Sequence, residues 1–211
     1  MTDTVTLSPP DAPASEDIAV GDPTWEVVDL YPRHGEWTKA SYLALTECGR
    51  GVEFEQGFVR FLPMPTKQHQ LVVKWLQYRL EQVTGFDRVI PGAYAVQTAD
   101  GRFRQPDIVY AENPDDLGDK FATAADLAIE VVSDAPSDRD RDFVQKRAEY
   151  AAAGIREYWI VDPADRAVTV LTLKDGTYVE HGRFAEGQTA TSLVVPDFAV
   201  PVAELFAAAG V

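Results

Sequence analysis

A strand-like alternation of apolar and polar residues marks the segment 52–62. Successive side chains of a strand point to opposite faces, so such alternation is typical of a strand with one buried face. The pair Gln56-Gly57 interrupts the alternation. The segment therefore predicts a hairpin that turns at this pair and carries Glu53 and Glu55 on its polar face.

Two nearby segments show the helical period instead. A short helix is predicted after Trp37, with Thr38 as its N-terminal cap. A longer helix is predicted between Thr66, which can cap its start, and Gly85, which ends it. Its apolar stripe consists of Leu71, Val72, Trp75, Leu76 and Leu80.

The rest of the chain predicts strands and two more helices. Residues 127–132 are apolar except at Glu130, as expected of a central strand covered on both faces. A helix is predicted over residues 137–153, and Gly154 suits its C-terminal end. The remaining predictions are strands at 89–96 and 103–110 joined by a turn at 99–101, a hairpin of 158–161 with 168–173, a β-rich segment at 178–195 and a short helix at 202–206.

These elements predict a single α/β domain over residues 23–211, with a mixed β-sheet core flanked by helices and extra β-hairpins toward both ends. Residues 1–22 are rich in Pro, Asp, Ser and Thr without an apolar period, which predicts a flexible tail. A chain of 211 residues with 45% hydrophobic residues can bury a full core.

Composition narrows the cellular setting. The single cysteine, Cys48, excludes an internal disulfide and disfavours a cysteine zinc site, which suits a reducing cytoplasm. The chain lacks a leader pattern and a run of about 18 apolar residues, so we expect a cytoplasmic location and no membrane partner. The net charge of −15 disfavours long duplex DNA as the substrate, because nucleic-acid binders usually contact phosphates through a basic surface.

Glu130 is the first candidate for chemistry. A carboxylate inside an apolar strand is desolvated, at a cost of several kcal/mol unless a cation compensates. One interpretation is a buried acid paired with Arg or Lys, and the other is a metal ligand.

Asp107 and Lys146 each have a structural interpretation as well. The Pro106-Asp107 pair is common in turns. Lys146, at about 40–60° from the apolar arc of its predicted helix, can lean toward the sheet. Asp142 lies one turn earlier, where it can form a surface ion pair with this lysine or orient it within a site.

Together, two carboxylates and a lysine have the composition of a magnesium-dependent phosphodiesterase site. Mg²⁺ prefers oxygen ligands and takes one or two protein carboxylates, and a bound cation activates water. Asp107 and Glu130 would hold Mg²⁺ or Mn²⁺, and Lys146 would orient the water or stabilise the transition state.

The chain from Glu53 to Pro163 resembles the Uma-type (Uma-two) family of restriction endonucleases in the PD-(D/E)XK nuclease superfamily. The resemblance rests on Glu53-Phe-Glu-Gln-Gly57, Pro63-Met-Pro-Thr with His69, Pro106-Asp107, Glu130-Val-Val-Ser133, Asp142 with Lys146, Tyr150, Gly154 and Glu157-Tyr-Trp-Ile-Val-Asp162-Pro163. It implies a restriction-endonuclease-like fold and Mg²⁺-dependent phosphodiester hydrolysis.

The resemblance also assigns roles to single residues. It implies Asp107, Glu130 and the main-chain carbonyl of Val131 as metal ligands, with Glu53 able to reach the metal from an earlier element. The superfamily's E-x-K spacing would place a lysine where this chain has Val132, and the Uma-type pattern moves it to Lys146.

Three further residues are expected around these ligands. His69, at the start of a helix, suits phosphate contact, although a structural or surface histidine is an equal alternative. Asp142 and Ser133 are expected to support the site or contact phosphate. Nearby arginines can contact a nucleic-acid backbone or form a solvated face alternating with aspartates, namely Arg102, Arg104, Arg139, Arg141 and Arg147.

The function predicted from the sequence is thus a metal-dependent endonuclease that acts on DNA, with a homodimer as the expected assembly. Two alternatives stay open: a binding or regulatory module that keeps the nuclease fold without catalysis, and a hydrolase of RNA or a small nucleotide. The negative charge and the displaced lysine favour the first alternative, and the charge also suits the second.

Overall fold

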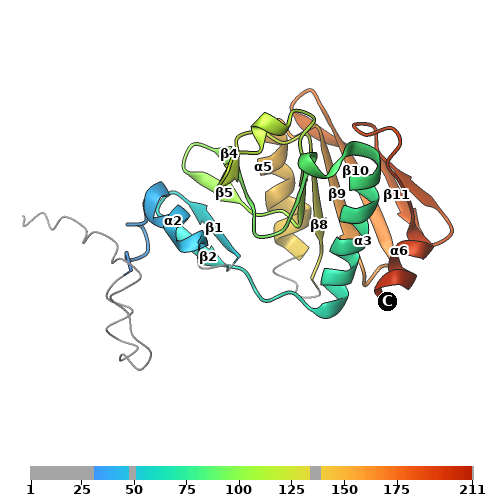
Figure 1. Ribbon diagram of the computed structural model, residues 1–211, viewed down its shortest axis with the longest axis horizontal. Coiled ribbons are helices and arrows are strands. Elements are labelled where there is room, and N and C mark those ends of the chain that lie inside the picture. The colour runs from blue at the N-terminus through green and yellow to red at the C-terminus, as the bar shows by residue number, and fades with distance from the viewer. Residues whose placement is uncertain (1–30, 48–50, 134–138, 211) are drawn as a thin grey trace, which may run out of the picture.

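Two mixed sheets, one of five strands and one of six, form the body of the protein (Figure 1). The structure is a computed structural model, and it describes residues 31–47, 51–133 and 139–210. The predicted tail at 1–22 and Cys48 lie outside the described residues. A short two-stranded sheet, β12-β13, completes the strands of the described ranges.

The described elements follow each other as α2 (Lys39–Thr46), β1 (Val52–Glu55), β2 (Phe58–Phe61), α3 (Lys67–Thr84), η1 (Phe86–Arg88), β3 (Val89–Pro91), β4 (Ala95–Ala99), β5 (Arg102–Arg104), β6 (Ile108–Tyr110), η2 (Pro114–Asp116), β7 (Phe121–Ala122), β8 (Leu127–Val131), η3 (Arg141–Gln145), α5 (Lys146–Ala152), β9 (Glu157–Asp162), β10 (Ala167–Lys174), β11 (Thr177–Ala185), β12 (Thr189–Thr191), β13 (Ala199–Pro201) and α6 (Val202–Ala209).

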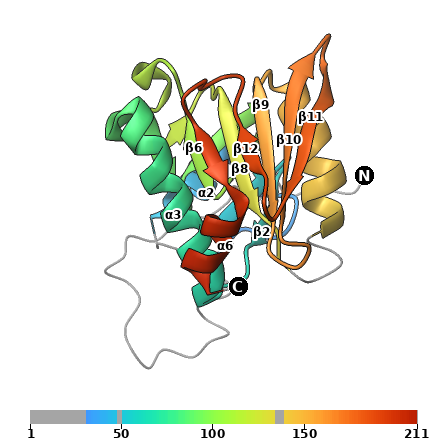
Figure 2. The ribbon, with the colours of Figure 1, turned by 90° about the vertical axis from the view of Figure 1, so that its right-hand side faces the viewer.

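The six-stranded sheet has the order β11-β10-β9-β8-β6-β3, with β8 in its interior. β8 pairs with β9 in parallel and with β6 in antiparallel orientation. Helices α3 and α6 cover one face and α5 covers the other (Figure 2). Ile129 packs in the cluster under α3 and α6, whereas Ala128 packs under α5, so the predicted alternation of this central strand is confirmed.

The five-stranded sheet has the order β2-β1-β5-β4-β7 and packs against α2 at one end of the molecule (Figure 1). Its β1–β2 hairpin turns at Gln56-Gly57, as predicted. Gly57 has a φ of +87°, and a Cβ there would lie 2.5 Å from the Gly35 carbonyl oxygen, so only glycine fits this turn.

The two strands predicted at 89–96 and 103–110 are instead four strands divided between the two sheets. β3 pairs with β6 in the six-stranded sheet, and β4 pairs with β5 in the five-stranded sheet. Ala93 has a φ of +61°, which breaks the first predicted strand, and Pro106, which lacks a donor, interrupts the second. The break leaves Asp107 between the sheets, directly before β6.

The helix starts are confirmed at both predicted caps. The Thr38 side chain accepts a hydrogen bond from the Ser41 amide, and the Thr66 side chain accepts one from the His69 amide. The helix predicted at 137–153 differs, because residues 141–145 form a π-helical turn before the α-helical part starts at Lys146. Such turns are frequent at functional sites.

No helix within the described residues is long and apolar enough to cross a membrane. The β9–β10 hairpin and α6 are both present, as predicted. Together the two mixed sheets and their flanking helices confirm the predicted α/β class.

Candidate active site

Three strands, taken from both sheets, and helix α5 bring polar side chains to one place. β6 and β8 pair with Ile108 opposite Ile129. Continuing that antiparallel register by one residue sets Asp107 opposite Glu130, so the two share a face of the sheet. β1 contributes Glu53, and the start of α5 contributes Lys146. The structure therefore brings together the carboxylates and the lysine that the sequence predicted.

Lys146 is the centre of the cluster and is only 1% exposed. Its Nζ donates a hydrogen bond of 2.7 Å to Glu130 Oε1. The same nitrogen lies 3.4 Å from Glu53 Oε1 and 3.4 Å from Asp142 Oδ1. The surface ion pair that the helical spacing allowed is thus excluded, because Lys146 and Asp142 are both buried.

Tyr150, one turn after Lys146 on α5, also holds Glu130. Its hydroxyl donates a 2.7 Å hydrogen bond to the same Oε1 atom that Lys146 contacts. Tyr150 belongs to the sequence pattern that resembles the family, but the sequence alone assigned it no role in the site. The helical i,i+4 spacing from Lys146 was the signal that could have placed it there.

Asp107 is held by two donors at the rim of the cluster. Its Oδ2 accepts a 2.7 Å hydrogen bond from the Val131 amide, and its Oδ1 lies 3.0 Å from His69 Nε2. The carboxylate is 22% exposed, so it is accessible from solvent. His69 therefore contacts a predicted metal ligand, and this places it at the site.

The structure gives less support to the predicted roles of Val131 and Ser133. The contact that Val131 makes with Asp107 is through its amide, and its carbonyl stays a predicted ligand. Ser133 lies two residues beyond the end of β8, and within the described parts of the chain its side chain makes no hydrogen bond.

Burial and crowding of charge perturb the pKa values of the cluster. Burial raises the pKa of Glu130, and the charges of Asp142 and Asp107 raise it further against the opposing effect of Lys146. Burial lowers the pKa of Lys146, but the carboxylates of Glu130, Glu53 and Asp142 outweigh burial and raise it. Lys146 thus faces three buried carboxylates, and Asp142 also lies 3.6 Å from Arg141 Nε, so the buried carboxylates outnumber the basic side chains that pair with them.

Two carboxylate oxygens without hydrogen-bond partners also indicate that the cluster has too few donors. Glu53 Oε1 and Asp142 Oδ1 are buried without a hydrogen-bond partner, although each approaches the Lys146 ammonium at 3.4 Å. Burial raises the pKa of Glu53, but Lys146, Arg104 and Arg141 together lower it, so this acid is ionised. A buried polar atom without a partner is rare and calls for an additional group, such as an ion or a water.

The donors suit a hard divalent cation by their chemistry, because carboxylate oxygens are the ligands of Mg²⁺ and Mn²⁺. Among the described residues, however, no group of three or more His, Cys, Asp or Glu side chains is already arranged to hold a metal ion. Glu130 Oε1 is occupied by Lys146 and Tyr150, and Asp107 Oδ1 by His69. A metal ion bound at these two atoms would therefore replace some of these contacts.

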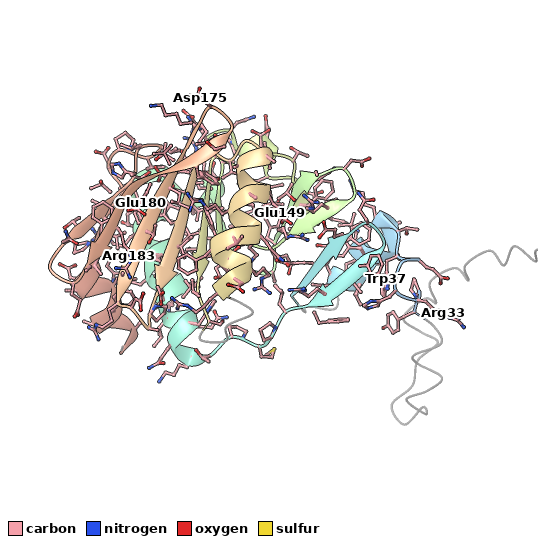
Figure 3. The ribbon with its side chains drawn as sticks, turned by 180° about the vertical axis from the view of Figure 1, so that it is seen from behind. Arg33, Trp37, Glu149, Asp175, Glu180 and Arg183 are labelled. Carbon is pink, nitrogen blue, oxygen red and sulfur yellow. The ribbon has the colours of Figure 1, made fainter. Side chains whose placement is uncertain are left out.

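A second polar layer connects the cluster to the five-stranded sheet. Arg104 on β5 donates hydrogen bonds to Glu55 of β1 at 2.6 Å and to Glu149 of α5 at 2.7 and 2.8 Å. Figure 3 shows Glu149 on α5, which stands between the two sheets. These bonds fix the distance between β1 and α5, and hence between Glu53 and Lys146.

Most of the arginines near the site interact with other groups of the protein. Arg102 pairs with Glu55, and Arg139 pairs with Asp162 at 2.6 Å. Arg147 donates to the Tyr178 carbonyl oxygen. The sequence offered a nucleic-acid contact or a solvated face alternating with aspartates; these three arginines and Arg104 instead pair with carboxylates or a carbonyl oxygen elsewhere in the fold.

A cleft of about 270 Å³ opens beside the cluster, between the β1–β2 hairpin and the start of α5. Glu53 belongs to both the cluster and the cleft. Sequence reasoning did not find this cleft. Its lining consists of His34, Glu53, Phe54, Glu55, Phe58, Val59, Arg60, Arg104, Arg141, Gln145 and Glu149.

A protein family and a solved structure are similar to this chain. Residues 40–203 match the family Uma2, described as "Putative restriction endonuclease". A solved structure of a "putative nuclease belonging to DUF820" from Anabaena variabilis ATCC 29413 is similar over 82% of this chain and 99% of that chain, with a TM-score of 0.66 and 17% identity. At this identity the likeness concerns the fold, and it confirms the predicted restriction-endonuclease-like class. No curated protein matches the chain.

Proposed function

Because the chain belongs to the Uma2 family of nucleases, we propose that it is a metal-dependent endonuclease that hydrolyses phosphodiester bonds of DNA. One observation carries the proposal. The buried Lys146 ammonium lies 2.7 Å from Glu130 in a cluster whose buried carboxylates (Glu130, Glu53 and Asp142) outnumber the basic side chains that pair with them (Lys146 and Arg141). Such an excess of negative charge suits a divalent cation.

Asp107 and Glu130 would hold Mg²⁺ or Mn²⁺, with the Val131 carbonyl and Glu53 as further ligands. A bound divalent cation lowers the pKa of water and neutralises charge that develops on phosphate. The exposed fraction of Asp107 provides the side from which a cation and a phosphate can enter.

Lys146 contributes through the three donors of its ammonium. Pointing at Glu130 from the start of α5, it can orient the attacking water or donate to a phosphate oxygen as negative charge develops there. Asp142 and Tyr150 position this pair, since one approaches the ammonium and the other donates to Glu130. His69 and Ser133 are the candidates for phosphate contact.

The second candidate is a nucleic-acid-binding module that keeps the fold without cleavage. It is favoured by the contacts that already occupy Glu130 and Asp107. Both candidates share nucleic acid as the partner. We further propose a cytoplasmic homodimer, and sedimentation velocity of the purified protein tests the dimer.

The test is a cleavage assay on single-stranded, duplex and branched DNA with Mg²⁺ or Mn²⁺. We expect cleavage by the wild type and a loss on the order of 10²-fold or more in Glu130→Gln and Lys146→Ala, by analogy with the loss of one transition-state donor. An RNA of the same sequence in a parallel reaction tests the RNA alternative.

Asp107→Asn and Asp126→Asn form the matched pair for this assay. Both aspartates accept a hydrogen bond from a main-chain amide and contact a basic side chain, and their exposed fractions are 22% and 23%. Asp126 lies away from the cluster, so Asp126→Asn should cleave like the wild type. Binding without cleavage under every condition would support the second candidate and reject the enzymatic one.

A further inference from the structure

The wall of the cleft is the face of the β1–β2 hairpin that carries Glu53. In the register of the hairpin, Glu53 pairs with Arg60 and Glu55 pairs with Phe58. Directly paired residues of antiparallel strands point to the same face, so all four side chains share this face. The cleft therefore joins an aromatic ring and an arginine on β2 to a carboxylate of the candidate site.

Phe58 is an unusual residue for such a wall because its side chain is 53% exposed. His34 packs against it with the ring planes at 88° and the ring centroids 5.7 Å apart. This edge-on contact holds the ring in place. Within the described parts of the chain no ring is stacked in parallel on Phe58, so a face of the ring can receive a flat partner.

Of the three arginines that line the cleft, Arg104 and Arg141 lie against carboxylates of the protein itself, and Arg60 is the candidate for binding an anion. Arg104 is fully engaged with Glu55 and Glu149, and Arg102 pairs with the same two acids, so two guanidinium groups neutralise two carboxylates. Arg60 is exposed, and in the described ranges it makes no hydrogen bond or ion pair. Its cross-strand neighbour Glu53 is directed to Lys146 instead.

We propose that this cleft is a subsite for one unpaired nucleotide next to the phosphate that is cleaved. The base stacks on Phe58 and the adjoining phosphate binds Arg60. The inference rests on the proposed function, and it specifies the substrate class as a nucleic-acid strand that is single-stranded or locally unpaired.

Two considerations favour an unpaired strand over a duplex. A base offers its face to an aromatic side chain only when it has left the stack, and such stacking is the usual mode of single-strand binding. The cleft, at about 270 Å³, is just below the range of 300–1,000 Å³ that is usual for small-molecule sites, so it is too small for more than one nucleotide unit. The net charge of −15 also disfavours the many phosphate contacts of duplex binding.

The test compares Phe58→Ala with Phe61→Ala. Phe61 lies on the same strand and is 52% exposed, but it pairs with Val52 and so belongs to the opposite face of the hairpin. Oligonucleotides of one sequence, single-stranded or duplex and containing 2-aminopurine, are titrated with each protein in the presence of Ca²⁺. Anisotropy gives the Kd, and 2-aminopurine fluorescence reports stacking.

We expect the wild type to bind the single strand more tightly than the duplex and to quench 2-aminopurine. Phe58→Ala should weaken single-strand binding roughly 5- to 150-fold, the range that corresponds to the loss of one stacked base, and should abolish the quenching. Arg60→Ala should weaken binding while the quenching of the bound strand is retained. Phe61→Ala should behave as the wild type, and thermal unfolding of both phenylalanine variants checks that they fold alike.

Equal behaviour of Phe58→Ala and Phe61→Ala, or duplex binding at least as tight as single-strand binding, would overturn the subsite. If the wild type still cleaves DNA in that case, the proposed function survives the loss of the subsite. Conversely, binding that depends on Phe58 without cleavage in Mg²⁺ or Mn²⁺ would keep the nucleotide site and reject the nuclease.

Discussion

At the scale of single residues, Lys146 determines the electrostatic state of the site. It is buried among Glu130, Glu53 and Asp142 and is the only ammonium within 4 Å of them in the described residues. Its removal would leave buried carboxylates without their lysine partner. Lys146 is therefore expected to affect stability as well as catalysis.

We predict that Lys146→Met lowers the free energy of unfolding of the metal-free protein by about 3–5 kcal/mol, as for a broken buried ion pair. Urea denaturation measures the change. The double variant Lys146→Met/Glu130→Gln should recover part of the loss, because it also removes the carboxylate that the lysine contacts.

Lys120→Met is the control, since Lys120 pairs with Glu47 while its side chain is 55% exposed. Exposed pairs contribute about 0–1 kcal/mol, so this variant should unfold almost like the wild type. If Lys146→Met changes the unfolding free energy no more than Lys120→Met does, the buried cluster does not depend on its lysine.

Tyr150 is a positioning residue in this scheme, because it acts on Glu130 and not on substrate. We predict that Tyr150→Phe lowers kcat with little change in KM, since Glu130 loses one of the donors that orient it. Steady-state kinetics on a cleaved oligonucleotide measures both parameters.

Tyr178→Phe is the matched variant for this prediction. Tyr178 is also buried, and its hydroxyl donates to the Ile155 carbonyl oxygen at 2.8 Å, away from the carboxylates. Its loss should reduce stability by about 1 kcal/mol and leave kcat intact. A similar fall of kcat in both tyrosine variants would show that Tyr150 acts through general stability.

The sequence predicted the identity of the central residues better than their contacts. Glu130 was recognisable because a charged residue interrupts an apolar strand, and the structure shows that it has the lysine partner that one interpretation required. That Glu53 also reaches Lys146 could not be derived, because this contact joins elements that are distant in the chain. The positions of Arg60 and Phe58 could have been predicted from the sequence. A hairpin that turns at Gln56-Gly57 pairs Arg60 with Glu53 and Phe58 with Glu55.

At the scale of elements, caps and turn residues predicted the helices and hairpins correctly. The assignment of the strands to two sheets was not predicted. Thr66 and Gly85 bound α3 as expected, because caps and glycine act on their own neighbours. The strands predicted at 89–96 and 103–110 were wrong as continuous elements, because Pro106 marks a change of sheet that periodicity does not reveal. The π-helical turn of residues 141–145 likewise leaves no signature in an apolar period.

These two irregular elements shape the candidate site. The break before β6 frees Asp107 to contact His69 and the Val131 amide. The π-helical turn precedes Lys146 and contains Asp142, which approaches the lysine ammonium. The regular parts of the fold were thus predictable, whereas the parts that shape the site depart from regular geometry.

At the scale of the whole molecule, the net charge of −15 limits how the protein can hold a polyanion. The arginines Arg102, Arg104 and Arg139 are engaged in ion pairs with the protein's own carboxylates. Few phosphate contacts are then available, so under the proposed function affinity would come mainly from stacking and from a bound metal.

We therefore predict a weak salt dependence of single-strand binding. With one or two phosphate contacts, at a slope of about −0.7 per phosphate, the Kd should rise only about 3- to 7-fold between 50 and 200 mM salt. Anisotropy titrations over this range measure the slope. A slope that corresponds to six or more contacts would instead require a basic binding surface.

The central claim, that the carboxylates around Lys146 receive a divalent cation, is tested most directly by thermal unfolding in the presence of Mn²⁺ or Mg²⁺. Metal at 100 times its Kd should stabilise the wild type by about 2.7 kcal/mol. We expect Asp126→Asn to keep this gain and Asp107→Asn to lose it. A wild type whose unfolding temperature does not respond to either metal, or a gain that survives in Asp107→Asn, would contradict the claim.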